Sequence, residues 1–308
     1  MRKIYIILIF FSVLLQYSCN SDKKNTEVLN LGVMSSMDYL PLAVAGREGY
    51  FDKLGLRIKI HKFYSANERD AAFQSGNVDG VVIDYTGAIL QKSGGFDLKL
   101  TSKCDAPFYI VAGANTTIDS LSQLKGAKVA VSQNTVIDYI VDMALQSVGL
   151  TASDIEKIEM NKIPLRFEML RNGKIDATGL PNPFALMAEK AGDKMLTSNA
   201  DLGFSITGIM FSQYSIDTKK DMIVKMYEGY NMGVDYLKSH TVEDIKDILI
   251  KDLGFTDETI SKAVLPNYTK AQMPSDADIQ KVVEWLATRK LIESSFDKNS
   301  LLDNQFVQ

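Results

Sequence analysis

The sequence predicts an α/β fold built from two similar units, and three observations support this. The 308 residues exceed one ordinary domain, and 46% of them are hydrophobic, which suffices for two cores. Short apolar runs alternate with segments of helical periodicity. Two segments, Phe73–Gly80 and Leu170–Ala177, also share one pattern: a helix ends on Gly, and a β-branched residue, Asp and a small residue follow.

The N-terminal segment predicts export. Arg2 and Lys3 precede the apolar run Ile4–Leu15. A helix that spans a bilayer needs about 20 residues, so this run is too short to be one. A basic start followed by a short apolar run is typical of a signal peptide, which we place at residues 1–18.

Cys19 follows a small residue where the apolar run stops, and this resembles a bacterial lipoprotein signal. The resemblance implies that Cys19 is lipidated and becomes the mature N-terminus, anchored by its acyl chains. Gln16 stands where the lipoprotein pattern usually has Leu, so ordinary signal-peptidase cleavage is the alternative, although no clear Ala-x-Ala site is present. Residues 19–27 are polar and predict a flexible tether.

The first unit alternates predicted strands and helices. Period-two alternation, apolar runs and Gly or Ser punctuation define its elements. The expected strands are 28–34, 56–63, 78–83, 98–101 and 109–112, and the expected helices are 40–48, 67–74 and 86–92.

The second unit repeats this alternation. Its clearest helix carries apolar residues at helical spacing from Ile137 to Val148 and stops at Gly149. The expected strands are 128–131, one near 158, and 177–180, and further helices are expected at 165–171 and from about 183. From Asp217 we expect a helical chain nearly to its end. Two apolar stripes there predict core faces: Ile223, Met226, Tyr227, Tyr230, Val234 and Leu237, then Ile279, Val282, Val283 and Leu286.

Composition excludes several functions. Removing the predicted signal lowers the net charge from −4 to about −6, and no basic patch occurs, so we expect no nucleic-acid partner. With Cys19 lipidated, Cys104 has no partner for a disulfide and is expected to be a buried, inert thiol. His61 and His240 are far apart in sequence and far from Cys104, so neither a zinc site nor a Cys–His pair is predicted. We expect no cofactor.

The motifs resemble the substrate-binding proteins of ABC importers for sulfonates, nitrate and thiamine precursors, the NMT1/THI5-like family. The resemblance begins with Tyr39–Leu56 and continues in order through Ser75–Asp79, Leu121–Val131 and Asn172–Ala177. It extends over about residues 28–237.

This resemblance implies a two-lobed periplasmic binding protein of type II, in which the lobes close on a ligand by a hinge motion. Lobe one would comprise residues 28–112 plus 211–308, and lobe two residues 113–210. The hinge crossings would lie near Ala112–Asn115 and Thr207–Phe211.

The resemblance also implies a function. The protein would capture a small molecule on the periplasmic side of a bacterial membrane, as a lipid-anchored monomer, and deliver it to an ABC permease without catalysis. Two alternatives stay open: an enzyme on the same fold, of the pyrimidine-synthase or chorismate-dehydratase type, or a ligand-binding lipoprotein that feeds no transporter.

Candidate ligand-binding residues follow from the fold class. In α/β sheets, ligands lie beyond the carboxyl ends of strands, where helix N-termini offer free N–H groups. This rule selects Ser35, Ser36, Asp38, Tyr39, Tyr64, Ser65, Asn67, Asp84, Tyr85 and Thr86 in lobe one, and Ser132, Asn134, Thr135, Asn182 and Phe184 in lobe two. Ser65, Asn67, Asn134 and Thr135 are equally suited to be helix caps.

The charge of the ligand stays open at this stage. Asp38 and Asp84 would repel an anion unless they are paired, which favours a neutral, zwitterionic or amine-bearing ligand. Serine and threonine side chains and helix N-termini suit anions. The usual Trp-x-Pro of the family is replaced here by Pro181-Asn182-Pro183, followed by Phe184.

Overall fold

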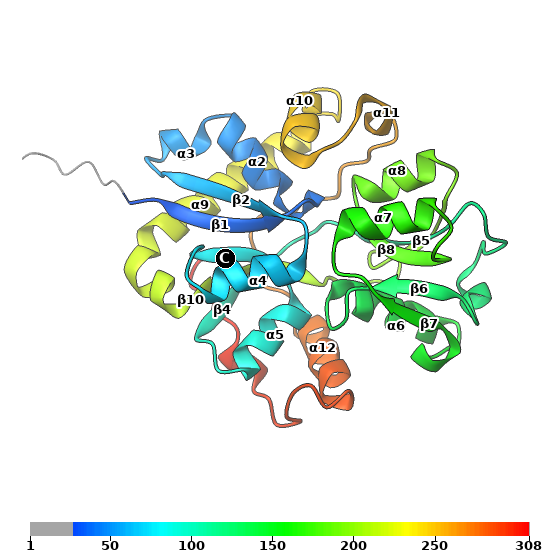
Figure 1. Cartoon of the computed structure of the whole chain (residues 1–308). Helices are drawn as coiled ribbons and strands as arrows, with labels where there is room; N and C mark the ends of the chain where they lie inside the picture. The colour runs from blue at the N-terminus through cyan, green and yellow to red at the C-terminus, as the bar shows by residue number, and fades with distance from the viewer. Residues whose placement is uncertain (1–26, 308) are drawn as a thin grey trace, which may run out of the picture.

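The computed structural model describes residues 27–307, which form two mixed five-stranded sheets covered by helices (Figure 1). The signal peptide and Cys19 lie outside the described residues. The first sheet has the order β2-β1-β3-β10-β4: Ile58–Phe63, Leu29–Met34, Gly80–Asp84, Thr207–Ser212 and Leu98–Lys103. The second has the order β7-β6-β8-β5-β9: Glu156–Glu159, Lys128–Val131, Ala177–Pro181, Phe108–Ala112 and Lys194–Ser198.

The helices cover both sheets. The α-helices are α2 (Leu40–Arg47), α3 (Tyr50–Lys53), α4 (Ala66–Gln74), α5 (Tyr85–Ser93), α6 (Val136–Ser147), α7 (Ile163–Arg171), α8 (Phe184–Lys190), α9 (Gln213–Ser239), α10 (Lys246–Ile248), α11 (Asp257–Ile260) and α12 (Asp276–Thr288). Short 3-10 helices are η1 (Met37–Tyr39), η2 (Leu121–Leu124), η3 (Ala152–Asp154) and η5 (Lys298–Ser300), and η4 (Leu249–Leu253) is a π-helix.

The two sheets have the same plan, which confirms the predicted α/β fold of two similar units. In each sheet three parallel strands, β2-β1-β3 or β7-β6-β8, are followed by an antiparallel strand, β10 or β5. The helix that leads into β3 or β8 ends on a left-handed glycine, Gly76 (φ +73°) or Gly173 (φ +61°). These are the glycines of the predicted repeat, and they close the helices where other L-residues would be strained.

The aspartates of the repeat have one structural role in both sheets. Asp79 Oδ2 accepts a hydrogen bond of 2.7 Å from Asn30 N, and Asp176 Oδ2 accepts one of 2.7 Å from Lys128 N. Each bond ties the turn before one strand, β3 or β8, to the start of its parallel neighbour, β1 or β6. The sequence repeat therefore reflects a repeated joint in space.

The lobe boundaries differ from those predicted at 112 and 211. Strand β5 pairs with β8 and β9 in the second sheet, and β10 pairs with β3 and β4 in the first. The chain therefore crosses between the sheets within residues 103–108 and 198–207. An apolar run predicts a buried strand but carries no information about which sheet the strand joins.

The C-terminal region is less continuously helical than expected. α9 begins at Gln213, but residues 261–275 contain no helix. Pro266 and Pro274 lie in this segment, and proline lacks the N–H that a helix interior needs and restricts the residue before it. The segment connects α11 to α12 along the junction of the two lobes (Figure 1).

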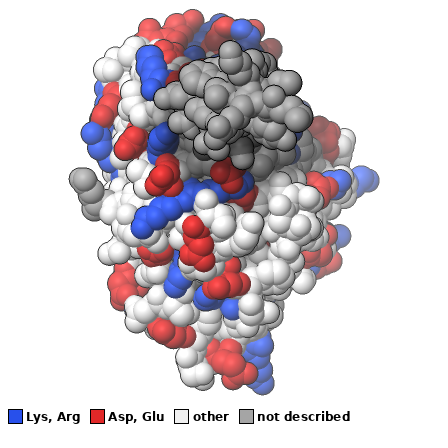
Figure 2. All heavy atoms as spheres, turned by 90° about the vertical axis from the view of Figure 1, so that its left-hand side faces the viewer, with Lys and Arg blue, Asp and Glu red and all other residues white. Residues whose placement is uncertain are grey.

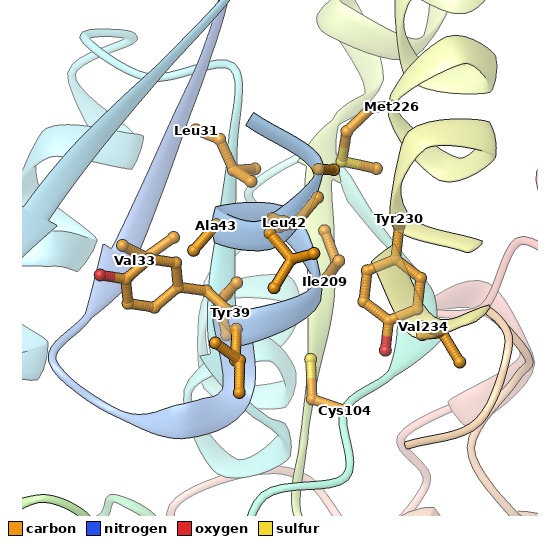
Figure 3. Close-up of a cluster of buried hydrophobic side chains, with 14 of the residues drawn as sticks. Leu31, Val33, Tyr39, Leu42, Ala43, Cys104, Ile209, Met226, Tyr230 and Val234 are labelled. Carbon is orange, nitrogen blue, oxygen red and sulfur yellow. The ribbon is translucent and has the colours of Figure 1, made fainter. Parts of the chain in front are cut away.

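The core of lobe one lies between its sheet and helices α2 and α9. Leu31 of β1, Leu42 of α2, Ile209 of β10, and Met226 and Tyr230 of α9 meet there (Figure 3). Both predicted C-terminal stripes are buried, which confirms them as core faces: Ile223, Met226, Tyr227, Tyr230, Val234 and Leu237 on α9, and Ile279, Val282, Val283 and Leu286 on α12.

The outer face of lobe one carries both signs of charge. Figure 2 shows Lys and Arg interspersed with Asp and Glu on the face turned away from lobe two. Neither sign forms a continuous patch among the described residues visible in this view.

Candidate functional site

A partly open cavity of about 40 Å³ lies between the lobes. It sits beyond the carboxyl ends of strands from both sheets, where ligand sites of α/β proteins occur. Lobe one contributes Met34, Ser36, Asp38, Ala66, Arg69, Val82, Ile83, Asp84 and Thr207, and lobe two contributes Phe108, Ser132, Thr135, Val136, Ile137, Asn161, Ile163, Arg166 and Pro181. Five of these were predicted from the sequence: Ser36, Asp38, Asp84, Ser132 and Thr135.

Asp38 is a buried carboxyl group at the cavity wall. Its Oδ1 accepts hydrogen bonds from Thr207 Oγ1 (3.0 Å) and Ala106 N (3.3 Å), and its Oδ2 accepts one from Ser36 Oγ (3.2 Å). Burial disfavours the charged form more than these bonds favour it, and raises the pKa of Asp38 to about 7. Near neutral pH this group exchanges between a hydrogen-bond donor and a full negative charge.

Asp84 is neutralised inside the protein. Its Oδ2 lies 3.2 Å from Nη2 of the buried Arg69, whose Nε also pairs with Asp70 at 2.8 Å. Its Oδ1 caps α5 by accepting from Gly87 N (2.8 Å) and from the hydroxyl of Thr86. Asp84 therefore meets the condition under which it would not repel an anion, because Arg69 compensates its charge.

Arg166 lines the cavity from α7 and is only 2% exposed. Its guanidinium donates to three backbone carbonyls, those of Met160 (2.9 Å), Asn161 (3.4 Å) and Gly179 (3.4 Å). Among the described residues it has no ion pair. Burial lowers its pKa to about 10, so it stays charged at neutral pH.

Four further polar residues of the cavity lining were not predicted from the sequence: Arg69, Arg166, Asn161 and Thr207. A charged residue within a helix predicts a solvent-facing position, and both arginines lie within helices. The sequence nevertheless contains a pattern that relates the two arginines: each stands seven residues before the glycine of the internal repeat, Gly76 or Gly173. Extending the repeat upstream would have selected both.

Several predicted residues of lobe one serve the structure outside the cavity. Ser35 Oγ donates to Leu253 O (3.2 Å), and the Tyr39 hydroxyl donates to Asp252 O. Ser65 caps α4 by accepting from Glu68 N (3.2 Å). Tyr85 is fully buried in the core.

Thr86 contacts Asp84 instead of facing the cavity. The other predicted residues lie around the cleft. Asn67 and Asn134 line a neighbouring groove that shares Asp84 and Thr135 with the cavity. Asn182 is buried with its Nδ2 3.9 Å from Met37 Sδ, and Phe184 packs against Phe167.

The two lobes contact each other on several sides of the cavity. Ile163 N donates to Tyr64 O (3.1 Å), which places the half-exposed Tyr64 at the junction. Near it Lys162 pairs with Glu68 at 3.1 Å. These contacts hold the lobes together beside the cavity, and a hinge motion that separates them would widen access to it.

The described cysteine and the two histidines, which could serve nucleophilic or metal chemistry, lie outside the cavity lining. Cys104 is buried outside the cavity lining, and burial raises the pKa of its thiol well above the ordinary value. His61 is on β2 with Nε2 3.0 Å from Asn30 Oδ1, and His240 follows α9. No group of three His, Cys, Asp or Glu residues within 27–307 could hold a metal ion.

Comparison with known proteins agrees with this architecture. The fold is that of periplasmic binding proteins: it superposes on the ligand-binding component of an ABC-type import system from Staphylococcus aureus, solved with zinc bound. The TM-score is 0.79 at 13% identity, over 91% of this chain and 98% of that one, a likeness that shows the fold alone. The sequence profile of the NMT1-like family matches residues 22–203, and the chain belongs to this family.

Two curated relatives extend the similarity over most of the chain. One is YtlA of Bacillus subtilis (strain 168), named as a binding protein, at 22% identity over 92% of this chain and 87% of its own. The other, from Brachyspira hyodysenteriae (strain ATCC 49526 / WA1), is named as an ABC transporter periplasmic binding protein, at 23% identity over 71% of this chain and 68% of its own. Within residues 27–307, no helix combines the length and apolar character needed to cross a membrane.

Proposed function

We propose that this protein is the extracytoplasmic solute-binding component of an ABC importer. It captures a small molecule between its lobes and presents the closed form to a permease. The observation that carries the proposal is the cavity between the lobes, whose wall combines apolar and polar residues from both lobes. A ligand there contacts both lobes only in the closed state, so binding stabilises closure. Membership of the NMT1-like family and the names of the relatives support it.

A non-catalytic role fits the side chains at the cavity. Its titratable groups are Asp38, Asp84 and two arginines, and the described residues place no cysteine or histidine in its lining. Ser132 and Thr135 line it, but Ser132 Oγ donates to Asn161 Oδ1 (2.8 Å) and Thr135 Oγ1 donates to Ser132 O (2.8 Å). Neither hydroxyl is bonded to a base that could activate it. We therefore propose that the protein binds its solute without turnover. We also propose that it acts as a monomer.

We further propose anchoring through a lipidated Cys19 at the outer side of a bacterial membrane. The support is the N-terminal sequence, and residues 19–27 are long enough to let the lobes move free of the bilayer. Two acyl signals give stable anchoring at about 0.8 kcal/mol for each buried CH2 group. Mass spectrometry of the mature protein, with Cys19→Ser as control, tests this. A mature chain without acyl mass, or one that still carries residues 1–18, contradicts it.

An uptake experiment tests the transport role. The protein is purified from its native host without denaturation, and the copurifying solute is released and identified by mass spectrometry. Uptake of that radiolabelled solute is then compared between wild-type and deletion cells. We expect uptake to fall at least tenfold at low external concentration. Unchanged uptake points to a binding lipoprotein that feeds no transporter, and chemical conversion of the solute by the purified protein points to an enzyme.

A further inference from the structure

The two buried arginines of the cavity occupy equivalent positions in the internal repeat. Arg69 is the fourth residue of α4 and Arg166 the fourth residue of α7, and each precedes the glycine that closes its helix by seven residues. The equivalence holds in space as well. Arg69 donates to Val82 O and Arg166 to Gly179 O, both at 3.4 Å, and each acceptor lies six residues after its glycine.

The equivalent arginines differ in their partners. Arg69 is neutralised by Asp70, the next residue, and by Asp84, eight residues after the glycine. The corresponding residues of lobe two are Phe167 and Pro181, which carry no charge. Arg166 thus donates its hydrogen bonds to backbone carbonyls and forms no ion pair among the described residues, and the exposed Glu159 acts on it only at longer range. A buried cation that lacks an ion-pair partner costs several kcal/mol.

In lobe two, the place that corresponds to the Asp84 carboxylate holds no acidic side chain, and the residues around it line the cavity. Nη2 of Arg69 holds the Asp84 carboxylate, whereas Nη2 of Arg166 has no acceptor among the described residues. Arg166 and Pro181, the counterpart of Asp84, both line the cavity. The carboxylate that lobe one supplies from its own chain is therefore missing from lobe two at a point that a bound solute can reach.

We propose that the solute is a small oxyanion, a carboxylate or sulfonate, and that Arg166 selects it by binding its charged group where Asp84 binds Arg69. This inference rests on the proposed solute-binding function and deepens it. Hydrogen bonds between guanidinium and carboxylate are among the strongest in proteins, and burial strengthens them further. Asp38 does not oppose the anion below pH 7, because there its carboxyl group is mainly protonated and can donate.

Isosteric probes of different charge test the class of ligand. Acetate, acetamide and acetamidinium have nearly the same shape and carry charges of −1, 0 and +1, and methanesulfonate with methanesulfonamide forms a second pair. They are among the smallest carboxylates and sulfonates, so they make the least demand on a cavity of about 40 Å³. Binding to wild-type protein freed of copurifying solute is measured by calorimetry at constant ionic strength. We expect acetate or methanesulfonate to bind at least tenfold more tightly than its uncharged counterpart, and acetamidinium not to bind.

Variants on one helix test the role of Arg166. Arg166→Gln should abolish the preference for the anion, and Arg166→Lys, which keeps the charge but loses the fork geometry, should retain it with weaker binding. The matched control is Arg171→Gln on the same α7 helix. It removes the same charge from an exposed side chain that bonds Ala191 O (3.0 Å) outside the cavity, and it should bind like the wild type.

A third variant keeps Arg166 and fills its vacant position. Pro181→Asp introduces a carboxylate at the counterpart of Asp84, where it should pair with Arg166 and exclude the probe. We expect the anion to bind at least tenfold more weakly, while the melting temperature without probe is unchanged or higher. This variant remains informative if Arg166→Gln does not fold.

The outcomes separate this inference from the proposed function. Equal or tighter binding of acetamide or acetamidinium, or a copurifying solute that is neutral or cationic, overturns the oxyanion class while solute transport stands. Anion preference that survives in both Arg166→Gln and Pro181→Asp overturns the role of Arg166. Unchanged uptake in deletion cells removes the transport role and leaves the dependence of anion binding on Arg166 intact.

Discussion

At the scale of single residues, Asp38 links stability to pH. Burial raises its pKa from 3.8 to about 7, so the folded protein holds this proton more tightly than the unfolded chain. Its contribution to stability is complete below pH 4 and is lost as the pH rises through 7. A shift of this size corresponds to an upper limit of roughly 4 kcal/mol, at about 1.4 kcal/mol for each pKa unit.

We therefore expect Asp38→Asn to become more stable relative to the wild type as the pH rises from 4.5 to 8. Asparagine can accept from Thr207 and Ala106 and donate to Ser36, but it does not titrate. The difference in the free energy of unfolding should grow by a few kcal/mol across this range. Urea unfolding at several pH values measures it, and a difference that does not change with pH contradicts the assignment.

At the scale of elements, glycines set how closely helices approach. A Cβ on Gly233 of α9 would lie 2.1 Å from Pro41 O of α2, whereas a Cβ on the exposed Gly46 of α2 meets only Phe51, at 3.9 Å. The first contact is with rigid backbone and leaves no room for a methyl group. The second is an ordinary van der Waals distance.

These two glycines make a matched pair of substitutions. Gly233→Ala should destabilise the protein by roughly 1–3 kcal/mol because it forces α9 away from α2. Gly46→Ala should stabilise it by roughly 0.5–1 kcal/mol, because alanine is the better helix former. Thermal and urea unfolding measure both changes. Equal effects of the two variants would show that the α2–α9 contact is not tight.

At the scale of the whole molecule, α12 ties the C-terminal segment to lobe two. Asp142 of α6 accepts from Trp285 Nε1 of α12 (2.9 Å) and from Nη1 of Arg289 (3.0 Å), the residue that follows α12. It also pairs with Lys157. α12 packs on α5 of lobe one, so this cluster joins the lobes. Trp285 is the single tryptophan of the chain, and its fluorescence therefore reports on the junction.

We expect Asp142→Ala to loosen the junction and to shift Trp285 emission to longer wavelength as water enters. The lost charge-assisted hydrogen bonds correspond to roughly 1.5–3 kcal/mol each. The radius of gyration measured by X-ray scattering should increase. The control is Asp276→Ala, which breaks an exposed ion pair of the same helix with Lys298 and should change neither signal.

Most elements of the two units, the repeat and the C-terminal core stripes were predictable because local periodicity encodes them, but strands β9 and β10 were not among the expected ones. Val129 and Ala130 belong to a short apolar run that forms a buried strand, and Gly76 and Gly173 mark helix ends whatever the later path of the chain. Five cavity residues were predictable for a related reason. Ser36, Asp38, Asp84, Ser132 and Thr135 directly follow strands or begin helices, and the fold class assigns ligands to those positions.

What the sequence by itself determined is therefore the α/β class, the two units, the family resemblance and the predicted export signal, all properties of neighbouring residues. Only the tertiary structure decided which sheet β5 and β10 join, and that Arg69 forms ion pairs whereas Arg166 forms none within residues 27–307. Pairing of buried strands and of buried charges depends on groups far apart in sequence. Desolvation makes those pairings energetically decisive, and neither propensity nor periodicity records them.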